Sequence, residues 1–209
     1  MADHLRARLS GLLLLAAGLA APFSHSSDAP GSDVRSLCDE IGRKLGSVSV
    51  RDCLRQGLQG TGAYSVLGRP LAKKVYAPKP PKRPLGKILV IGGIHGDEYS
   101  SVSVVFKWMD ILNIHHSGLF HWHFVPLSNP DGLLRRRSQR QNDRGVDLNR
   151  NFPTSDWVES AEDYWKSRTG SDPRRYPGPA AVSEPEVAYL VKEIDEFQPD
   201  IIISMHAPY

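Results

Sequence analysis

The chain has 209 residues, of which 40% are hydrophobic and 23% are charged, and its formal net charge at pH 7 is +3. This length allows one domain of ordinary size with a substantial core, and the composition is that of a globular protein. The net charge is too small to indicate a nucleic-acid-binding protein, and we expect no nucleic-acid partner.

Residues 1–26 are predicted to be a secretory signal peptide. Basic residues lie between positions 4 and 8, and a continuous run of apolar or small residues fills 11–23. A small-residue cleavage site is plausible near Ser24-His25-Ser26. The apolar run is too short to span a bilayer as a stable helix. An uncleaved anchor and a misassigned start codon are the alternatives. We therefore expect a secreted or periplasmic protein without a stable membrane anchor after cleavage.

Residues 27–62 are predicted to form a small N-terminal helical appendage. Apolar residues recur at helical spacing over Asp33–Leu45, and residues 48–54 form a second short element. Cys38 and Cys53 are the only cysteines. An oxidising compartment would permit a disulfide between them, and two buried free thiols are the alternative.

Residues 63–209 are predicted to form the main domain. Strands that alternate with helices predict an α/β fold with a mixed, largely parallel sheet flanked by helices. A long loop is expected at 128–146, and Ser183 with Glu186 forms a predicted capping box. The other expected elements are a hairpin over Ala63–Leu67 and Leu71–Tyr76, strand Lys87–Ile91, helix Tyr99–Ile114, strand Leu119–Leu127, helix Trp157–Lys166, a helix from Ser183 to Phe197 and strand Asp200–Ser204.

Two histidines share one side of the strand Leu119–Leu127. Alternation places His121 and His123 opposite the aromatic residues of the same strand. Such a pair suits a metal ion, but we favour a half-exposed strand face.

Three side chains follow two of the predicted strands and form a candidate metal site. His95 and Glu98 come after the strand Lys87–Ile91 at an i, i+3 spacing, which in a helical turn places them on one face. His206 follows the strand Asp200–Ser204. Ligands bind at strand ends in sheets of this class. Two histidines and one glutamate leave a fourth position open for water, which distinguishes a catalytic zinc from a structural one.

Five segments, in order along the chain, resemble the zinc carboxypeptidase family, and within it the bacterial murein peptide amidase branch. They are HGDE at 95–98, NPDG at 129–132, RGVDLNRNFP at 144–153, SEPE at 183–186 and ISMH at 203–206. The resemblance implies that His95, Glu98 and His206 bind Zn²⁺. It covers about Ala63 to Tyr209.

The resemblance also implies roles for the residues around the metal. Asp147 matches the acid that accepts a hydrogen bond from the first ligand histidine. Asn149 and Arg150 match the pair that holds the substrate's terminal carboxylate, a task that suits the planar guanidinium. Tyr209 stands where an aromatic residue often lines the site. Arg140 matches the arginine that polarises the scissile carbonyl. The neighbouring arginines at 135–137 leave open which arginine corresponds to the one in the family.

Hydrolysis of an amide also needs a general base, and the sequence offers none at the family's position. In the family the base is a glutamate on a strand beyond the third zinc ligand, and this chain ends three residues after His206. A fragment that lacks the C-terminal part of the domain is one explanation. A natural short form that binds zinc and peptide without turnover is the other. In both cases we expect this chain alone to be inactive or unstable.

The leading functional hypothesis is an exported zinc metallocarboxypeptidase or amidase acting on cell-wall (murein) peptides with a free carboxylate. A deacylase of N-acyl amino acids is a second hypothesis, because succinylglutamate desuccinylase and its relatives share the H-x-x-E motif, the Asn-Arg pair and the later histidine. A non-catalytic peptide-binding module is the third.

Overall fold

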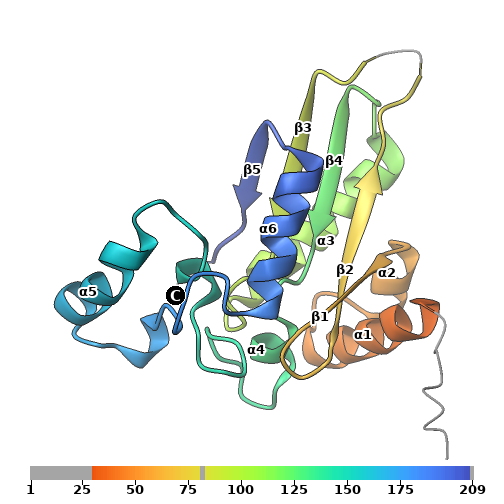
Figure 1. The fold of residues 1–209 in the computed structure, drawn as a ribbon. Coiled ribbons are helices and arrows are strands. Elements are labelled where there is room, and N and C mark those ends of the chain that lie inside the picture. The colour runs from red at the N-terminus through yellow and green to blue at the C-terminus, as the bar shows by residue number, and fades with distance from the viewer. Residues whose placement is uncertain (1–29, 81–82, 208–209) are drawn as a thin grey trace, which may run out of the picture.

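The computed structural model describes residues 30–80 and 83–207 (Figure 1). The predicted signal peptide and Tyr209 lie outside these residues. Within the described part of the chain, no helix combines the length and the apolar character needed to cross a membrane. The elements are α1 (Pro30–Lys44), α2 (Val50–Arg55), β1 (Gln59–Tyr64), β2 (Pro70–Tyr76), β3 (Gly86–Ile91), α3 (Tyr99–His115), β4 (Phe120–Val125), α4 (Pro130–Leu134), the 3₁₀ turn η1 (Leu148–Arg150), α5 (Trp157–Thr169), the 3₁₀ turn η2 (Pro173–Arg175), α6 (Pro185–Phe197) and β5 (Ile201–Ser204).

The strands form one mixed sheet in the order β1-β2-β4-β3-β5. The β1/β2 and β2/β4 pairs are antiparallel, whereas β4/β3 and β3/β5 are parallel. The prediction of an α/β fold with a mixed sheet flanked by helices is confirmed. The parallel half, made of β4, β3 and β5, is the part that leads to the candidate metal ligands.

Alternation along β3 divides the core between the two faces of the sheet. Ile88 and Val90 pack with the core that α1, α2 and α3 cover, whereas Leu89 and Ile91 pack against α6. Figure 1 shows α6 in front of the sheet and α3 behind it, with α5 standing apart from the sheet. Because both faces are covered, β3 reads as a continuous apolar run rather than an alternating one.

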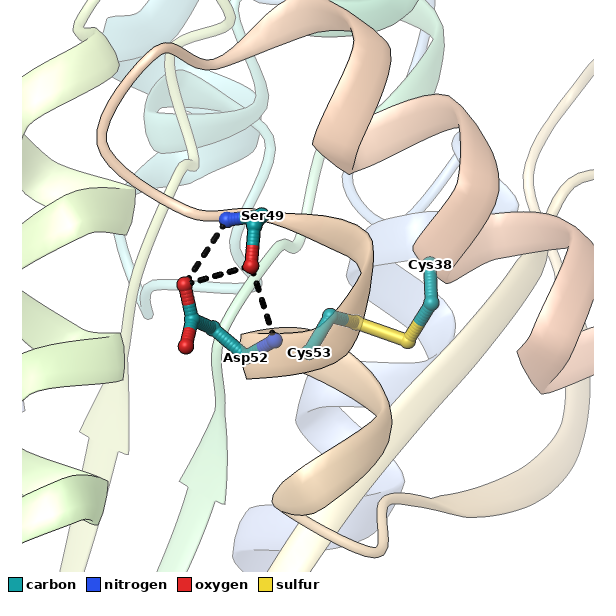
Figure 2. The surroundings of a disulfide bond; sticks show 4 residues. All are labelled: Cys38, Ser49, Asp52 and Cys53. Atoms are coloured by element: carbon teal, nitrogen blue, oxygen red, sulfur yellow. Dashed lines mark hydrogen bonds between the residues drawn. A yellow bond between two sulfur atoms is a disulfide. The ribbon is translucent and has the colours of Figure 1, made fainter.

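The N-terminal helices are held together by a disulfide (Figure 2). Cys38 in α1 and Cys53 in α2 are bonded, with their Cα atoms 5.4 Å apart. Ser49 begins α2 with a capping box: its hydroxyl accepts from the backbone N–H of Asp52 at 3.1 Å, and the Asp52 carboxylate accepts from the Ser49 N–H at 3.0 Å. The sequence left the two cysteines as thiols or a disulfide, and the structure has the disulfide.

The first strand of the hairpin differs from its prediction. We expected Ala63–Leu67, but β1 covers Gln59–Tyr64. Gly60 and Gly62 obscured it, because glycine normally weakens a strand interior. Here β1 is an edge strand with an irregular register between Gly60 and Tyr64, a place where glycine is tolerated.

Two further local predictions are wrong. The loop 128–146 contains the short helix α4, which Asn129 caps by accepting from the Gly132 N–H at 2.8 Å. The Ser183 capping box does not form: Glu184 is the N-cap residue of α6, and the Ser183 hydroxyl donates to its carboxylate at 2.8 Å. Proline at 185 begins the helix one residue later than the box requires.

The histidines of β4 lie opposite its aromatic residues, as the alternation predicted, and they pack against Phe197 of α6. The half-exposed strand face that we favoured is wrong for His123. His123 is buried, stacks on the Phe197 ring with centroids 3.6 Å apart, and pairs with Glu193. His121 is partly buried beside it. The only cluster with metal-ligating geometry in the described residues lies elsewhere.

Candidate metal centre

The segment that carries His95 and Glu98 is a tight turn at the end of β3. Gly93 has a φ of +60°, a conformation that side chains other than glycine adopt at a cost. A side chain on Gly96 would collide with the backbone of Gly132 in α4. The Glu98 N–H donates to the His95 carbonyl at 3.3 Å, so the i, i+3 spacing is realised by a single turn before α3 rather than inside a helix.

Parallel pairing of β3 and β5 brings His206 to this turn. Ile91 pairs with Ser204 in register, and the Met205 N–H donates to the Ile91 carbonyl at 2.8 Å. The residues that follow the two strands therefore lie at the same edge of the sheet. The His206 Nδ1 lies 3.1 Å from one Glu98 oxygen, and the His95 Nδ1 lies 2.8 Å from the other.

The three side chains have the donor types and spacing of a zinc site. One ligand atom from each of His95, Glu98 and His206 lies within 4.8 Å of the others. Tetrahedral zinc with ligand bonds of 2.0–2.2 Å separates its ligand atoms by about 3.4 Å, so small side-chain adjustments suffice. His95 is buried and His206 is partly open to solvent, with 37% of its side chain exposed. The open side leaves room for a further ligand.

Asp147 orients the first histidine. Its side chain is fully buried, and one carboxylate oxygen accepts from the His95 Nε2 at 3.1 Å. Because a carboxylate can only accept, this contact keeps a proton on Nε2, so Nδ1, which lies 2.8 Å from Glu98, is the ring nitrogen that a metal would use. The same oxygen accepts from the backbone N–H of Asn149 at 3.1 Å and so caps η1.

Arg140 lies against the same carboxylates. Its Nε donates to the second Asp147 oxygen at 2.9 Å, and another nitrogen lies 3.7 Å from Glu98. The backbone carbonyl of Arg140 accepts from the Gly96 N–H at 3.2 Å, which fixes the loop against the ligand turn. The arginines at 135–137 are exposed and form no ion pair within the described residues.

Electrostatics keep both acids of the centre ionised. Burial alone would raise the pKa of Glu98, but the Ala207 N–H, His95 and His206 together hold it below its ordinary value. Burial likewise opposes ionisation of Asp147, and the hydrogen bond from His95 and the charge of Arg140 hold its pKa low. An ionised Glu98 is the form that binds a cation.

Asn149 and Arg150 line a cleft of about 400 Å³ between η1 and α5. Because Arg150 is three residues from Asp147, their Cα atoms lie at most about 11 Å apart. The Arg150 Nε is buried without a hydrogen-bond partner in the described structure. The Arg150 guanidinium lies over the Tyr164 ring, 5.6 Å from its centroid. Asn149, on the wall of the cleft, donates its backbone N–H to Asp147 at 3.1 Å, which joins this wall to the acid of the metal centre.

A family model described as zinc carboxypeptidase matches residues 61–208. The chain belongs to the zinc carboxypeptidase family.

The chain is also similar to individual proteins. Murein peptide amidase A of Escherichia coli strain K12 is 38% identical over 154 residues, which cover 71% of this chain and 60% of that protein. Murein peptide amidase A of Vibrio campbellii is 32% identical over 149 residues, covering 69% and 55%. The fold is also that of bovine thrombin-activatable fibrinolysis inhibitor, solved with a tick carboxypeptidase inhibitor: the TM-score is 0.59 at 19% identity, covering 85% of this chain and 60% of the other. The chain thus spans somewhat more than half the length of these curated relatives.

Sequence reasoning missed the buried support of the zinc carboxypeptidase centre. Asn142 donates to Glu184 at 2.6 Å and to Glu186 at 3.2 Å, while its own oxygen accepts from the Val146 N–H at 3.1 Å. Burial raises the pKa of Glu186. These contacts hold the loop between Arg140 and Asp147 in shape. The SEPE segment was noted for its resemblance, but nothing local indicated that its acids turn inward.

Proposed function

We propose that this chain carries the zinc-binding and substrate-binding part of an exported metallocarboxypeptidase or amidase that hydrolyses murein peptides. The observation that carries the proposal is the convergence of His95, Glu98 and His206 beside the buried Asp147. The names of the bacterial relatives support murein peptide as the substrate class.

The positions of the residues in the site suggest a role for each of them. His95, Glu98 and His206 would hold Zn²⁺, which when bound lowers the pKa of a water molecule to about 7 and polarises a carbonyl. Arg140 would stabilise negative charge that develops on the carbonyl oxygen, because its guanidinium already faces the ligands. Asn149 and Arg150 would hold the terminal carboxylate in the adjoining cleft.

We propose further that the general base belongs to a longer polypeptide. Among the described residues, the only acids that hydrogen-bond to the two ligand histidines are Glu98 and Asp147, and both are engaged. The relatives' greater length supports this proposal. So does β5, which ends the sheet with Ile201 51% exposed and Ile202 47% exposed, an apolar edge that soluble proteins normally cover.

Export is supported by two features. The predicted signal peptide provides the route, and the disulfide between Cys38 and Cys53 suits an oxidising compartment.

Binding measurements test the proposal without requiring turnover. The zinc-loaded chain is titrated with a murein tripeptide and with the same peptide amidated at its C-terminus. We expect the free acid to bind at least about tenfold more tightly, because the amide loses one charge-assisted contact with Arg150. Arg150→Gln should remove this difference, and His121→Ala, away from the site, should keep it.

Three outcomes would contradict parts of the proposal. Equal affinity for acid and amide would refute the carboxylate-binding role. A strong preference for an N-succinyl amino acid over the peptide would favour the deacylase. Robust zinc-dependent hydrolysis by this chain alone would refute the missing general base.

A further inference from the structure

The cleft beside the metal centre contains a second arginine for which no role has been assigned. Arg175, at the end of η2, lines the cleft together with Asn149 and Arg150. The other walls are largely aromatic and apolar, and they include Phe152, Trp157, Tyr164 and Trp165.

Hydrogen bonds fix the segment from α5 to η2 against the metal centre. The Trp157 indole donates to the Arg150 carbonyl at 2.8 Å, which joins the start of α5 to η1. At the other end, the Asp147 N–H donates to the Tyr176 carbonyl at 2.8 Å. Arg175 therefore lies next to a residue that is bonded to the acid of the metal centre.

Further contacts hold the segment between α5 and η2 in place. The Trp165 indole donates to the Asp172 carbonyl at 2.7 Å, and the Trp165 ring packs on Tyr176 with centroids 5.0 Å apart. The Gln141 side chain donates to the Pro173 carbonyl at 2.8 Å. With anchors on both sides, the backbone of Arg175 has a defined place relative to Arg150.

The Arg175 guanidinium keeps donors available for a ligand. Within the described residues its only ion pair is with Asp172 at 3.6 Å, which is longer than a good hydrogen bond, and half of the side chain is exposed. Asp156 also lines the cleft as an anion, since bonds from Thr154 and Ser160 lower its pKa. Asp156 is exposed, so water and salt screen its repulsion of a bound carboxylate.

We propose that Arg175 is a specificity-determining residue that binds a second carboxylate, carried by the side chain of the substrate's C-terminal residue. This inference rests on the proposed function, in which Asn149 and Arg150 hold the terminal carboxylate. One cleft then presents two guanidinium groups to a residue with two carboxylates. Peptides that end in an acidic residue are preferred over isosteric neutral ones.

The test compares two peptides that differ only in a C-terminal Glu or Gln, titrated calorimetrically into the zinc-loaded chain. We expect the Glu peptide to bind about tenfold more tightly, the factor of one charge-assisted hydrogen bond. Arg175→Gln should bring the ratio of the two affinities close to one, with a much larger loss for the Glu peptide than for the Gln peptide. Arg150→Gln should weaken both peptides by a similar factor. Arg168→Gln is the matched control, because Arg168 is exposed on α5 outside the cleft. It should leave the affinities for both peptides unchanged.

The variants separate this inference from the proposed function. Suppose that Arg150→Gln weakens the binding of both peptides, but the wild-type chain binds the Glu and Gln peptides equally well. The terminal carboxylate site then stands, and the role of Arg175 is refuted. The role of Arg175 is also refuted if Arg175→Gln keeps the wild-type preference for the Glu peptide over the Gln peptide. If neither peptide binds, both proposals fail. Arg175→Lys, which keeps the charge, should retain part of the ratio, and circular dichroism verifies that each variant is folded.

Discussion

Replacing Asp147 by Asn should weaken zinc binding, although Asp147 is not one of the three candidate ligands. Asp147 accepts three hydrogen bonds: one oxygen from the His95 Nε2 at 3.1 Å and from the Asn149 N–H at 3.1 Å, the other from the Arg140 Nε at 2.9 Å. The side chain is fully buried, so water cannot replace a lost partner.

Neither orientation of an asparagine at position 147 satisfies these donors. If the amide oxygen faces His95, the amide nitrogen meets the Arg140 Nε, and two donors oppose each other. If the amide nitrogen faces His95, it donates to Nε2 and moves the imidazole proton to Nδ1, the atom that would bind zinc. We expect a loss of about 10–100-fold in zinc affinity, equivalent to about 1.4–2.8 kcal/mol.

Zinc affinity is measured by competition with a chromophoric chelator at neutral pH, and circular dichroism monitors the fold. Asp143→Asn is the matched control, because Asp143 is exposed on the same loop. The reasoning is refuted if Asp147→Asn is folded like the wild type and binds zinc with unchanged affinity.

Three further predictions concern stability and the ligand turn. Replacing Cys38 and Cys53 by Ser should lower the melting temperature by about 6–12 °C, since closing a 15-residue loop contributes about 3 kcal/mol; thermal melts with and without reductant measure this. Glu193→Gln should cost about 2 kcal/mol in urea unfolding at neutral pH, because the carboxylate pairs with His123 and Lys73. Gly96→Ala should destabilise the fold by about 1–3 kcal/mol and weaken zinc binding, because the new methyl group collides with the α4 backbone.

The controls and pH dependence sharpen these predictions. Burial opposes ionisation of Glu193, but His123 and Lys73 hold its pKa below the ordinary 4.5. Its contribution is therefore complete above that value and is lost as the pH falls through the lower folded-state pKa. The stability gap of Glu193→Gln should close on acidification, and a pH-independent gap contradicts the assignment. Gly46→Ala, where nothing lies within 4 Å, should be neutral. The Ser double variant should melt identically with and without reductant.

The meeting of His95, Glu98 and His206 was predictable because local signals determined their positions. His95 and Glu98 follow one buried strand directly, and His206 follows another. Once β3 and β5 pair in parallel, the residues after both strands must emerge at one edge. The i, i+3 spacing of His95 and Glu98 is realised by a single turn before α3, which brings the two side chains together as a helical turn would.

What the sequence did not reveal depends on contacts between distant segments. Nothing local indicates that the Trp157 indole reaches back to Arg150 or that Tyr176 bonds to Asp147, so the cleft and its second arginine were not predicted. The burial of His123 likewise depends on Phe197, far along the chain. Edge strand β1 was misplaced because its glycines are typical of turns, and only its position at the end of the sheet makes them tolerable.

The most direct test of the central claim is X-ray absorption spectroscopy of the zinc-loaded chain, with the metal content of matched variants. A single zinc per chain should show only nitrogen and oxygen ligands at about 2.0–2.2 Å, including two imidazoles. His206→Ala should lose one imidazole from the spectrum and bind zinc much more weakly, whereas His121→Ala should match the wild type. An unchanged spectrum and affinity in His206→Ala would contradict the convergence of His95, Glu98 and His206 on one metal ion.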